Sequence, residues 1–572
     1  MKILDKKNYI TILLFSVLFF SSEGFAKDSK IQYSSENISN YFSGMVLAKK
    51  DENEKAFKHL KKVQLLKNTH SRYSIEFLRT LVLLEKFDQA FTFSKDVWRE
   101  DELFFEADLL LGIDALLKND YVTSEKHFKR LNTISRYNLF FEDFLGNVLL
   151  SWNRASQGSK EDSFNYLKKI PKPYVHLTKI QEAFLYCYFD SSKTKESFSE
   201  LIDHKDYDFS RYNFFLVNYL LSKEKHIEAK KIIKDSSGKH KSNLLLKQTE
   251  NFLLKKKDKK IKNYFSCKNS RDSIAVIFYI IANLYSSEKN YKMSNFYLKI
   301  SYYLNNKFLP NKALLAENFY YQERNELSKK TYESLKSTGS VYSWYASKSI
   351  AAILLMDNGK KQSIKSLEKD FNLISSPTYE HYYELANFYK DNEYYKKSIK
   401  YYSLTLNKIS KDHFLVPKIL DRRGTSYERL GDWKSAEKDL IRSLELLPDQ
   451  PHVLNYLAYS WVDMGINLDK GLEMLKKATQ LRKDDGYIID SLGWAYYAKQ
   501  NYVEAEQFLQ RAVELLPNDP IINDHYADAL WMMNKNIQAR YVWSYILKFD
   551  EIEPNLRESI NKKLLFGVNK KL

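Results

Sequence analysis

A small residue returns about every 34 positions in the C-terminal part of the chain, each time with the same companions. Two copies show it: Gly424, Tyr427, Ala436, Leu440 and Pro448, then Gly493, Tyr496, Ala505, Leu509 and Pro517 at identical offsets. A fixed period of this length indicates one supersecondary unit used repeatedly. A chain of this kind folds as an array in which each unit packs on its neighbours, so its 572 residues need no single large core.

The period extends through most of the chain. With the small residue as marker, the regular series is Ala282, Ala316, Ala351, Ala386, Gly424, Ala458, Gly493 and Ala527. A second small residue follows each marker: Ser294, Ser328, Ser363, Ser398, Ala436, Gly471, Ala505 and Ala539. A weaker series with the same period comes earlier: Gly44, Leu78, Gly112 and Gly146, followed by less regular units at Ala183 and Val217.

This pattern resembles the tetratricopeptide repeat, in which two antiparallel helices, A and B, carry small residues where they approach each other and a proline ends the unit. The resemblance implies an all-α solenoid, a right-handed superhelix of about 12 to 14 helix pairs. We expect divergent repeats over residues 27–275 and a regular array over residues 276–550. Residues 551–572 are expected to form a capping helix or tail, because a terminal repeat has an uncovered apolar face.

The N-terminus has the pattern of an export signal. Three lysines lie among the first seven residues, an apolar run covers residues 10–20, and Gly-Phe-Ala at 24–26 provides small-x-small cleavage geometry. The apolar run is shorter than the roughly 20 residues of a membrane-spanning helix. We therefore predict a cleaved signal peptide, residues 1–26, and a mature protein in a bacterial periplasm; a retained anchor is the alternative.

The two cysteines, Cys187 and Cys267, lie 80 residues apart in the sequence, which is about two repeats. At roughly 8–10 Å per packed helix, regular stacking would hold their Cα atoms beyond the roughly 4.4–6.8 Å of a disulfide. We expect two buried thiols, with a structural disulfide as the alternative.

Charge is unevenly distributed. The whole chain carries a net charge of +18, whereas residues 417–549 contain 17 Lys plus Arg against 19 Asp plus Glu, a net of −2. Export argues against nucleic acid as the partner of the basic part, so either a solvated surface or contact with an anionic membrane or wall surface remains. The run Lys255–Lys260 is interpreted either as a solvated helix end or as a docking point for an acidic surface.

Catalytic patterns are missing from the sequence. We find no H-E-x-x-H, no G-x-S-x-G, no phosphate-binding glycine loop and no paired cysteines with zinc spacing. We therefore expect no enzymatic activity, no cofactor and no metal site.

In tetratricopeptide arrays the A helices line a concave face, so the resemblance implies where a partner would bind. At the usual ligand-facing positions the last three units have Asn455, Tyr459, Asp463, Tyr487, Asp490, Trp494, Tyr497, Asp524, Asp528 and Trp531. These residues are aromatic and acidic, without one lysine. Tyr and Trp are common anchors of binding interfaces, and carboxylates beside them favour cationic side chains or an extended peptide. The alternative is that Trp494 and Trp531 only fill the space between adjacent A helices.

The same segment has distinctive phrases, among them "DDGYIIDSLGWAYY" and "NDPIINDHYADALWMMNKNIQAR". They resemble tetratricopeptide proteins of the Gram-negative cell envelope, notably alphaproteobacterial ones. Relatives in that group include outer-membrane lipoproteins that recruit a carboxyl-terminal processing protease. Those adaptors carry a lipidated cysteine, and this chain has no cysteine near its cleavage site.

Together these observations predict a non-enzymatic scaffold or adaptor in the periplasm. It would bind a partner protein or peptide, with a periplasmic protease as the specific candidate, and would touch a membrane at most peripherally. The alternative is an envelope-associated structural protein whose basic N-terminal array contacts an anionic membrane or wall surface.

Overall fold

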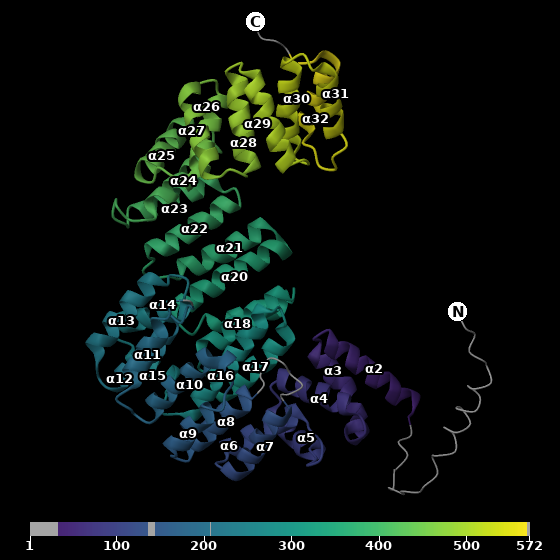
Figure 1. The fold of residues 1–572 in the computed structure, drawn as a ribbon, viewed down its shortest axis with the longest axis vertical. Helices are drawn as coiled ribbons and strands as arrows, with labels where there is room; N and C mark the ends of the chain where they lie inside the picture. The colour runs from purple at the N-terminus through teal and green to yellow at the C-terminus, as the bar shows by residue number, and fades with distance from the viewer. Residues whose placement is uncertain (1–32, 135–142, 206, 569–572) are drawn as a thin grey trace, which may run out of the picture. The chain divides into compact units, whose positions relative to one another are not determined.

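The computed structural model describes residues 33–134, 143–205 and 207–568. The proposed signal peptide, residues 1–26, lies outside these ranges. The described chain is helical, with short turns between helices and no strand (Figure 1). It divides into two compact units, residues 1–357 and residues 358–572.

The helices of the first unit follow one another along the described chain. They are α2 (Ser35–Lys49), α3 (Asn53–Leu60), α4 (Ser71–Leu83), α5 (Phe87–Val97), α6 (Phe105–Leu117), α7 (Tyr121–Ile134), α8 (Phe144–Ser156), α9 (Lys160–Leu167), α10 (Val175–Tyr188), α11 (Thr194–Ile202), α12 (Tyr212–Ser222), α13 (His226–Lys239), α14 (Leu244–Leu254), α15 (Asp258–Tyr264), α16 (Ser270–Ser287), α17 (Tyr291–Leu304), α18 (Leu309–Tyr321), α19 (Asn325–Leu335) and α20 (Ser340–Asn358). Two short 3-10 helices, η1 (Lys61–Asn68) and η3 (Lys172–Tyr174), lie between them.

The second unit continues in the same manner. Its helices are α21 (Lys360–Asn372), α22 (Tyr379–Asp391), α23 (Tyr395–Leu406), α24 (Val416–Glu428), α25 (Trp433–Leu446), α26 (Pro451–Asp463), α27 (Leu468–Leu481), α28 (Gly486–Ala498), α29 (Tyr502–Leu515), α30 (Pro520–Met532), α31 (Asn536–Ile546) and α32 (Pro554–Phe566).

Successive helices pair in the described chain from α2/α3 to α18/α19 in the first unit and from α22/α23 to α30/α31 in the second, and α32 follows. Helices α20 and α21 follow each other in the sequence at the boundary between the units. Each of the eight markers of the regular series lies in one helix, and its small partner lies in the next. The predicted all-α fold of helix pairs is therefore confirmed. The short pair α14/α15 is the irregular one, and the run Lys255–Lys260 covers the turn between its two helices. The change from divergent to regular repeats at residue 276 stays a prediction.

Close helix contact explains the small residues. A Cβ atom built on Gly493 of α28 would lie 2.6 Å from the Leu509 side chain and 3.1 Å from its backbone nitrogen in α29. A side chain at this position would collide with Leu509, so a small residue is favoured where the two helices approach most closely.

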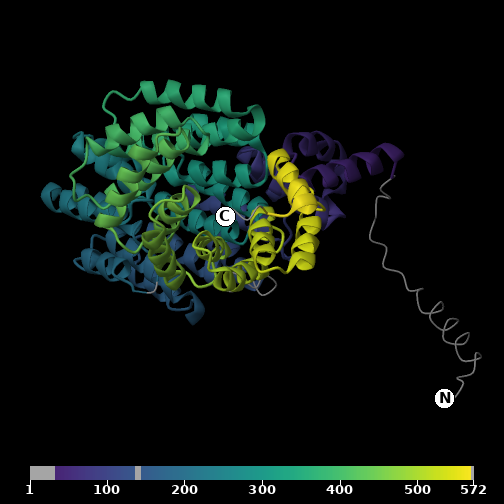
Figure 2. The same cartoon turned by 90° about the horizontal axis from the view of Figure 1, so that it is seen from above.

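The first unit folds back on itself, so that helices far apart in sequence pack together. Helix α17 packs on α4, and α16 packs on α8. Lys292 of α17 donates to the Ala48 carbonyl and to the Glu76 carboxylate, both at 3.0 Å. The Phe87 ring stacks on Tyr303 with centroids 4.0 Å apart. Figures 1 and 2 show the purple first helices against the teal helices of this region.

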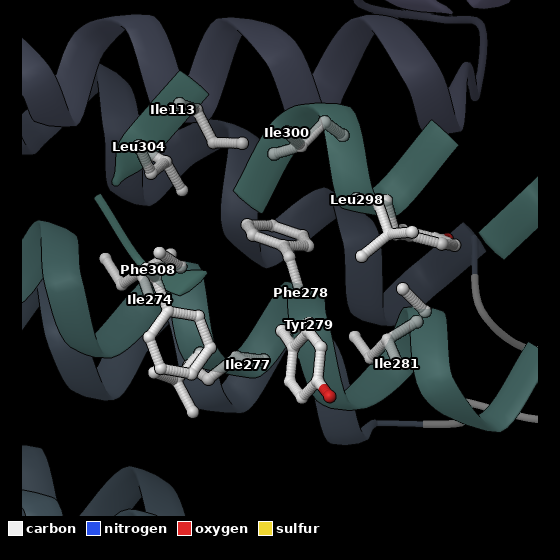
Figure 3. Packing of buried hydrophobic residues seen from close by; sticks show 14 of the residues in the cluster. Ile113, Ile274, Ile277, Phe278, Tyr279, Ile281, Leu298, Ile300, Leu304 and Phe308 are labelled. Carbon is white, nitrogen blue, oxygen red and sulfur yellow. The ribbon is translucent and has the colours of Figure 1, made fainter. Parts of the chain in front are cut away.

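Figure 3 shows the apolar side of this return. Ile113 of α6 lies with Ile300 and Leu304 of α17 in one hydrophobic cluster, although the sequence separates them by nearly two hundred residues. Burial of such aliphatic side chains stabilises the folded-back arrangement by roughly 1.5–3 kcal/mol for each side chain.

The prediction of two separate thiols was wrong. Cys187, near the end of α10, and Cys267, in the loop before α16, form a disulfide with Cα atoms 5.8 Å apart. The prediction assumed regular stacking over the intervening repeats. Instead, the short helix α15 packs on both α12 and α14, and the loop that follows it returns to α10.

In the second unit, the substantial contacts of the described residues join helices one or two places apart in sequence. Helix α32 packs on α31, and its Ile560 is fully buried in the last hydrophobic cluster. No helix in the described ranges has the length and apolar character needed to cross a membrane.

Candidate functional site

The ten predicted binding residues lie on the first helices of the last three pairs. Asn455, Tyr459 and Asp463 belong to α26; Tyr487, Asp490, Trp494 and Tyr497 to α28; Asp524, Asp528 and Trp531 to α30. Adjacent first helices pack on each other, α26 on α28 and α28 on α30. The three helices therefore present one continuous surface, which we call the α26–α28–α30 face.

The predicted residues differ sharply in exposure. Asp463 is exposed and Tyr487 is 59% exposed, whereas Tyr459, Trp494 and Tyr497 are half-buried. Asp490, Asp524 and Asp528 are buried, at 5–7% exposure. The surface that a partner can reach is thus mainly aromatic.

A three-ring stack forms the centre of the face. The Trp494 indole lies between the Tyr497 ring, with centroids 4.6 Å apart, and the His525 imidazole, with centroids 4.0 Å apart. The planes are nearly parallel, at 6° and 15°. Stacking of this kind adds about 0.5–1.5 kcal/mol per pair to the burial of the rings, so the Trp494 ring is held in place before any partner arrives.

His525 is anchored underneath by a carboxylate. Its Nδ1 lies 3.0 and 3.1 Å from the two carboxylate oxygens of Asp490. Burial lowers the pKa of His525, but the charge and hydrogen bond of Asp490, with Asp524 and Asp528 nearby, outweigh it and raise the pKa above its usual value. Asp490 serves as the counter-ion of the imidazole when the imidazole is protonated.

A lysine from the end of the chain reaches the other two buried carboxylates. Lys563 Nζ on α32 lies 2.8 Å from an oxygen of Asp524 and 2.8 Å from an oxygen of Asp528. Asp524 also accepts a hydrogen bond of 3.0 Å from the indole nitrogen of Trp543. The face that was expected to lack lysine therefore has one in the structure, supplied by α32. These two carboxylates have a cationic partner within the chain.

Asp528 nevertheless has a perturbed pKa. Burial and the neighbouring charge of Asp524 raise it from 3.8 to about 6, against the lowering effect of Lys563 and His525. One oxygen of Asp528 is buried without a hydrogen-bond partner among the described residues.

The remaining predicted residues lie at the margins of the face. The Trp531 ring is 5.5 Å from that of Trp543, and Gly567, with a φ of 72°, lies so close to Trp531 that a Cβ atom there would collide. Trp531 is therefore partly covered by the end of the chain. On the opposite side, burial and the charges of Asp463 and Asp490 raise the pKa of Tyr459 to about 12, and a buried oxygen of Asn455 has no hydrogen-bond partner among the described residues.

Sequence reasoning missed His525, Lys563 and Trp543. His525 lies one position from the predicted ligand-facing Asp524, and its distance of 35 residues from Asp490 is one residue more than the repeat, which was a usable signal. Lys563 had no such signal, because its contact depends on how α32 docks. In the described ranges no group of three or more His, Cys, Asp or Glu side chains is placed to hold a metal ion.

Comparison with protein families matches residues 488–519, which cover most of α28 and α29, to the family described as Tetratricopeptide repeat. This segment of the chain is thus similar to one tetratricopeptide repeat. Proteins built on such repeats generally mediate protein–protein interactions and are typically non-enzymatic scaffolds.

Two curated relatives resemble part of the chain. A TPR repeat-containing protein of Pseudomonas aeruginosa is 31% identical over 103 residues, which is 18% of this chain and 18% of the relative. A UDP-N-acetylglucosamine–peptide N-acetylglucosaminyltransferase of Giardia intestinalis is 32% identical over 131 residues, 22% of this chain and 8% of that enzyme. This chain thus spans less than a fifth of the length of each.

Solved structures are also similar over part of the chain. A tetratricopeptide repeat protein from Parabacteroides merdae has 19% identity and a TM-score of 0.32, covering 39% of this chain and 88% of its own. MamA from Desulfovibrio magneticus has 16% identity and a TM-score of 0.28, covering 32% of this chain and 98% of its own.

Proposed function

We propose that the protein is a periplasmic scaffold that binds a partner protein through the α26–α28–α30 face. The single observation that carries this proposal is the Tyr497–Trp494–His525 stack, a half-buried aromatic ledge fixed from below by Asp490. A large side chain that is already held in one orientation loses little entropy on binding, and Trp and Tyr dominate the energy of many interfaces.

The structure changes the chemistry that we expect of the partner. Three of the four predicted carboxylates are buried and have partners within the chain, namely His525, Trp543 and Lys563. Strong selection for a cationic peptide by these carboxylates is therefore not expected. Apolar or aromatic side chains that pack on Trp494 and Tyr487, with hydrogen bonds at the rim, suit this surface better.

The disulfide supports an extracytoplasmic location. Disulfides persist in oxidising compartments such as the periplasm and are rare in the cytosol, and the Cys187–Cys267 bond is buried at both ends. Together with the basic and apolar pattern of the first 26 residues, this favours export. Recruitment of a periplasmic protease is the finer form of the proposal, and it depends on the phrase resemblance of residues 452–543.

A site-specific photo-crosslink tests the proposal. A benzophenone amino acid at position 487, which is 59% exposed on the face, is compared with one at position 541, a 76% exposed tyrosine on α31. We expect a specific adduct from position 487 in an envelope extract and none of the same mass from position 541. The adduct is identified by mass spectrometry, and the purified partner is then titrated.

The titration uses Trp494→Ala and Tyr487→Ala, with Tyr541→Ala as the matched control. We expect each face variant to weaken binding about tenfold or more, as for a hot-spot residue, and the control to leave it unchanged. Equal affinity of all three variants would refute the proposal. If the captured partner is not a protease, protease recruitment fails while the scaffold function stands.

A further inference from the structure

The first unit contains a hollow. It is a cavity of about 340 Å³ between α12, α14, α16, α18 and α20, at the lower end of the roughly 300–1,000 Å³ typical of small-molecule sites. Its apolar walls are formed by Phe215, Val276, Ile280, Phe308, Leu314 and Tyr342. Figure 3 shows Tyr279 beside this wall, with its hydroxyl oxygen turned away from Phe278.

One cation lines the cavity without an ion-pair partner. Arg211, mostly buried at the start of α12, lies with its guanidinium carbon 5.5 Å from the centre of the Tyr279 ring. Within the described ranges no carboxylate lies within 4.0 Å of Arg211, whereas Arg79, Arg130 and Arg423 each have such a partner. Tyr279, through its ring and a side-chain hydrogen bond, and Asp208 from a greater distance offset the burial of Arg211. An anion in the cavity would be the first charged group to pair with Arg211 directly.

The two carboxylates that also line the cavity do not fill this role. Asp208 is exposed at the rim, accepts a hydrogen bond from the Ser210 backbone at 2.8 Å and lies 3.8 Å from His240; it attracts Arg211 only from beyond ion-pair distance. Glu317 accepts a hydrogen bond from the Tyr345 hydroxyl, and burial raises the pKa of Glu317. The Glu317 carboxylate is thus paired with α20, and within the described ranges it forms no ion pair with Arg211 inside 4.0 Å.

The disulfide braces the wall of this cavity. Phe184, one turn before Cys187, and Phe265, two residues before Cys267, both pack on Phe215, with ring centroids 4.9 and 4.7 Å apart. Phe215 itself lines the cavity. The covalent link thus holds two of the rings behind that wall in place and preserves the shape of the hollow.

We infer that this cavity binds a small organic carboxylate with an apolar body, held by Arg211. The planar guanidinium matches a carboxylate in two parallel hydrogen bonds, and the apolar walls would cover the rest of the molecule. The volume suits a free small acid and leaves little room for a folded partner or a long peptide. The inference is independent of the proposed scaffold function, which concerns the other unit.

Calorimetric titration of the full-length protein with 3-phenylpropanoate tests the inference. We expect saturable binding of the acid and none of its methyl ester, which has the same body without the charge. Arg211→Gln should weaken binding about tenfold to 100-fold, as for loss of a charge-assisted pair. The matched control is Arg271→Gln, which changes an exposed arginine outside the cavity and should bind like the unaltered protein.

A second variant separates the cavity from the charge. Ala313→Phe puts a large ring on the cavity wall and should abolish binding while leaving Arg211 in place. Thermal unfolding accompanies both variants and shows that each is folded at the temperature of the titration.

Three results would overturn the inference. One is equal binding of the acid and its ester, and another is unchanged binding by both Arg211→Gln and Ala313→Phe. The third is binding of a peptide with a free C-terminal phenylalanine, such as acetyl-Gly-Gly-Phe, by a protein that ignores the free acid.

Discussion

The two units are built from the same kind of helix pair, but they differ in whether other helices of the same unit cover the pairs. In the first unit α16 and α17 return to pack on α8 and α4, so helices of the chain itself cover its early repeats. In the second unit the substantial contacts of the described residues link helices one or two places apart, and half-exposed aromatics remain along α26, α28 and α30. The local repeat is shared, whereas the long-range contacts decide which surface stays open.

This difference assigns different properties to the units. Contacts across more than 200 residues, such as Lys292 with Ala48 and Gln322 with Asp51, make the first unit behave like a globular domain. An array held by neighbour contacts has a stability that is close to a sum over its repeats. We therefore expect the first unit to unfold as one block and the second to open from its ends.

Removing the disulfide should have the largest effect. In Cys187→Ala combined with Cys267→Ala, loss of an 80-residue loop constraint is expected to lower the free energy of unfolding of the first unit by about 4 kcal/mol. Hydrogen exchange measured by mass spectrometry on the full chain reports each unit separately. Exchange in α21 to α32 serves as the internal control and should not change. Equal loss of protection in both units would contradict the division between them.

Breaking the buried pair under the aromatic stack should be the next largest effect. Asp490→Ala leaves His525 buried without its counter-ion, and we expect a loss of about 3 kcal/mol in the second unit. Asp463→Ala, an exposed carboxylate on α26, should change stability by less than about 0.5 kcal/mol. If the two variants behave alike under urea, the Asp490–His525 contact is not a structural pair.

Much of this architecture could be predicted from the sequence, because small residues at helix crossings leave a periodic trace. Gly493 against Leu509 is one such crossing, and the period placed every marker of the regular series in the correct helix. The return of the first unit left no such trace. Ile113 and Leu304 look like ordinary core residues of their own repeats, and nothing local shows that they share one cluster. The assumption of regular stacking wrongly predicted separate thiols at Cys187 and Cys267, because the local sequence does not show where the chain returns.

The candidate site was predictable only in part. Periodicity placed Tyr487, Trp494 and Tyr497 on one face, but it could not show which carboxylates are satisfied inside the chain. Lys563 reaches Asp524 and Asp528 from a helix outside the repeat pattern. A side chain supplied by a capping helix has no fixed register with the array, so its contacts follow from docking alone.

The cation that joins α17 to the early helices of the first unit gives a smaller effect. Lys292→Met removes two hydrogen bonds of a charged group, to Ala48 and Glu76, and we expect a loss of about 2 kcal/mol. Exchange should rise in α2 to α4 and in α17 together, because they lose a shared contact. Lys230→Met, at an exposed lysine on α13, is the matched control. A rise in exchange confined to α17 would mean that the packing of α17 on the early helices does not couple their stabilities.

The smallest expected effect is a pH dependence of the second unit. The pKa of Asp528 is raised from 3.8 to about 6 in the folded protein, by burial and then by Asp524. The folded state therefore binds more protons than the unfolded state between these values. The stabilisation contributed by Asp528 is fully present below pH 3.8. It is lost as pH rises through 6, by about 1 kcal/mol between pH 5 and 8.

His525 adds to this loss. Its folded pKa is raised above the ordinary value, mainly by Asp490 against the opposing effect of burial, so the stability that it contributes is present below about pH 6.5 and disappears as the imidazole loses its proton. Urea unfolding at pH 5 and 8, followed by exchange in α28 to α32, measures the sum. His525→Gln should reduce the difference in stability of the second unit between pH 5 and pH 8, and Asp528→Asn should reduce this difference by more. Neither substitution should change the stability of the first unit. A second unit that is more stable at pH 8 than at pH 5 would mean that the buried carboxylates and His525 do not hold the protons that this arrangement requires.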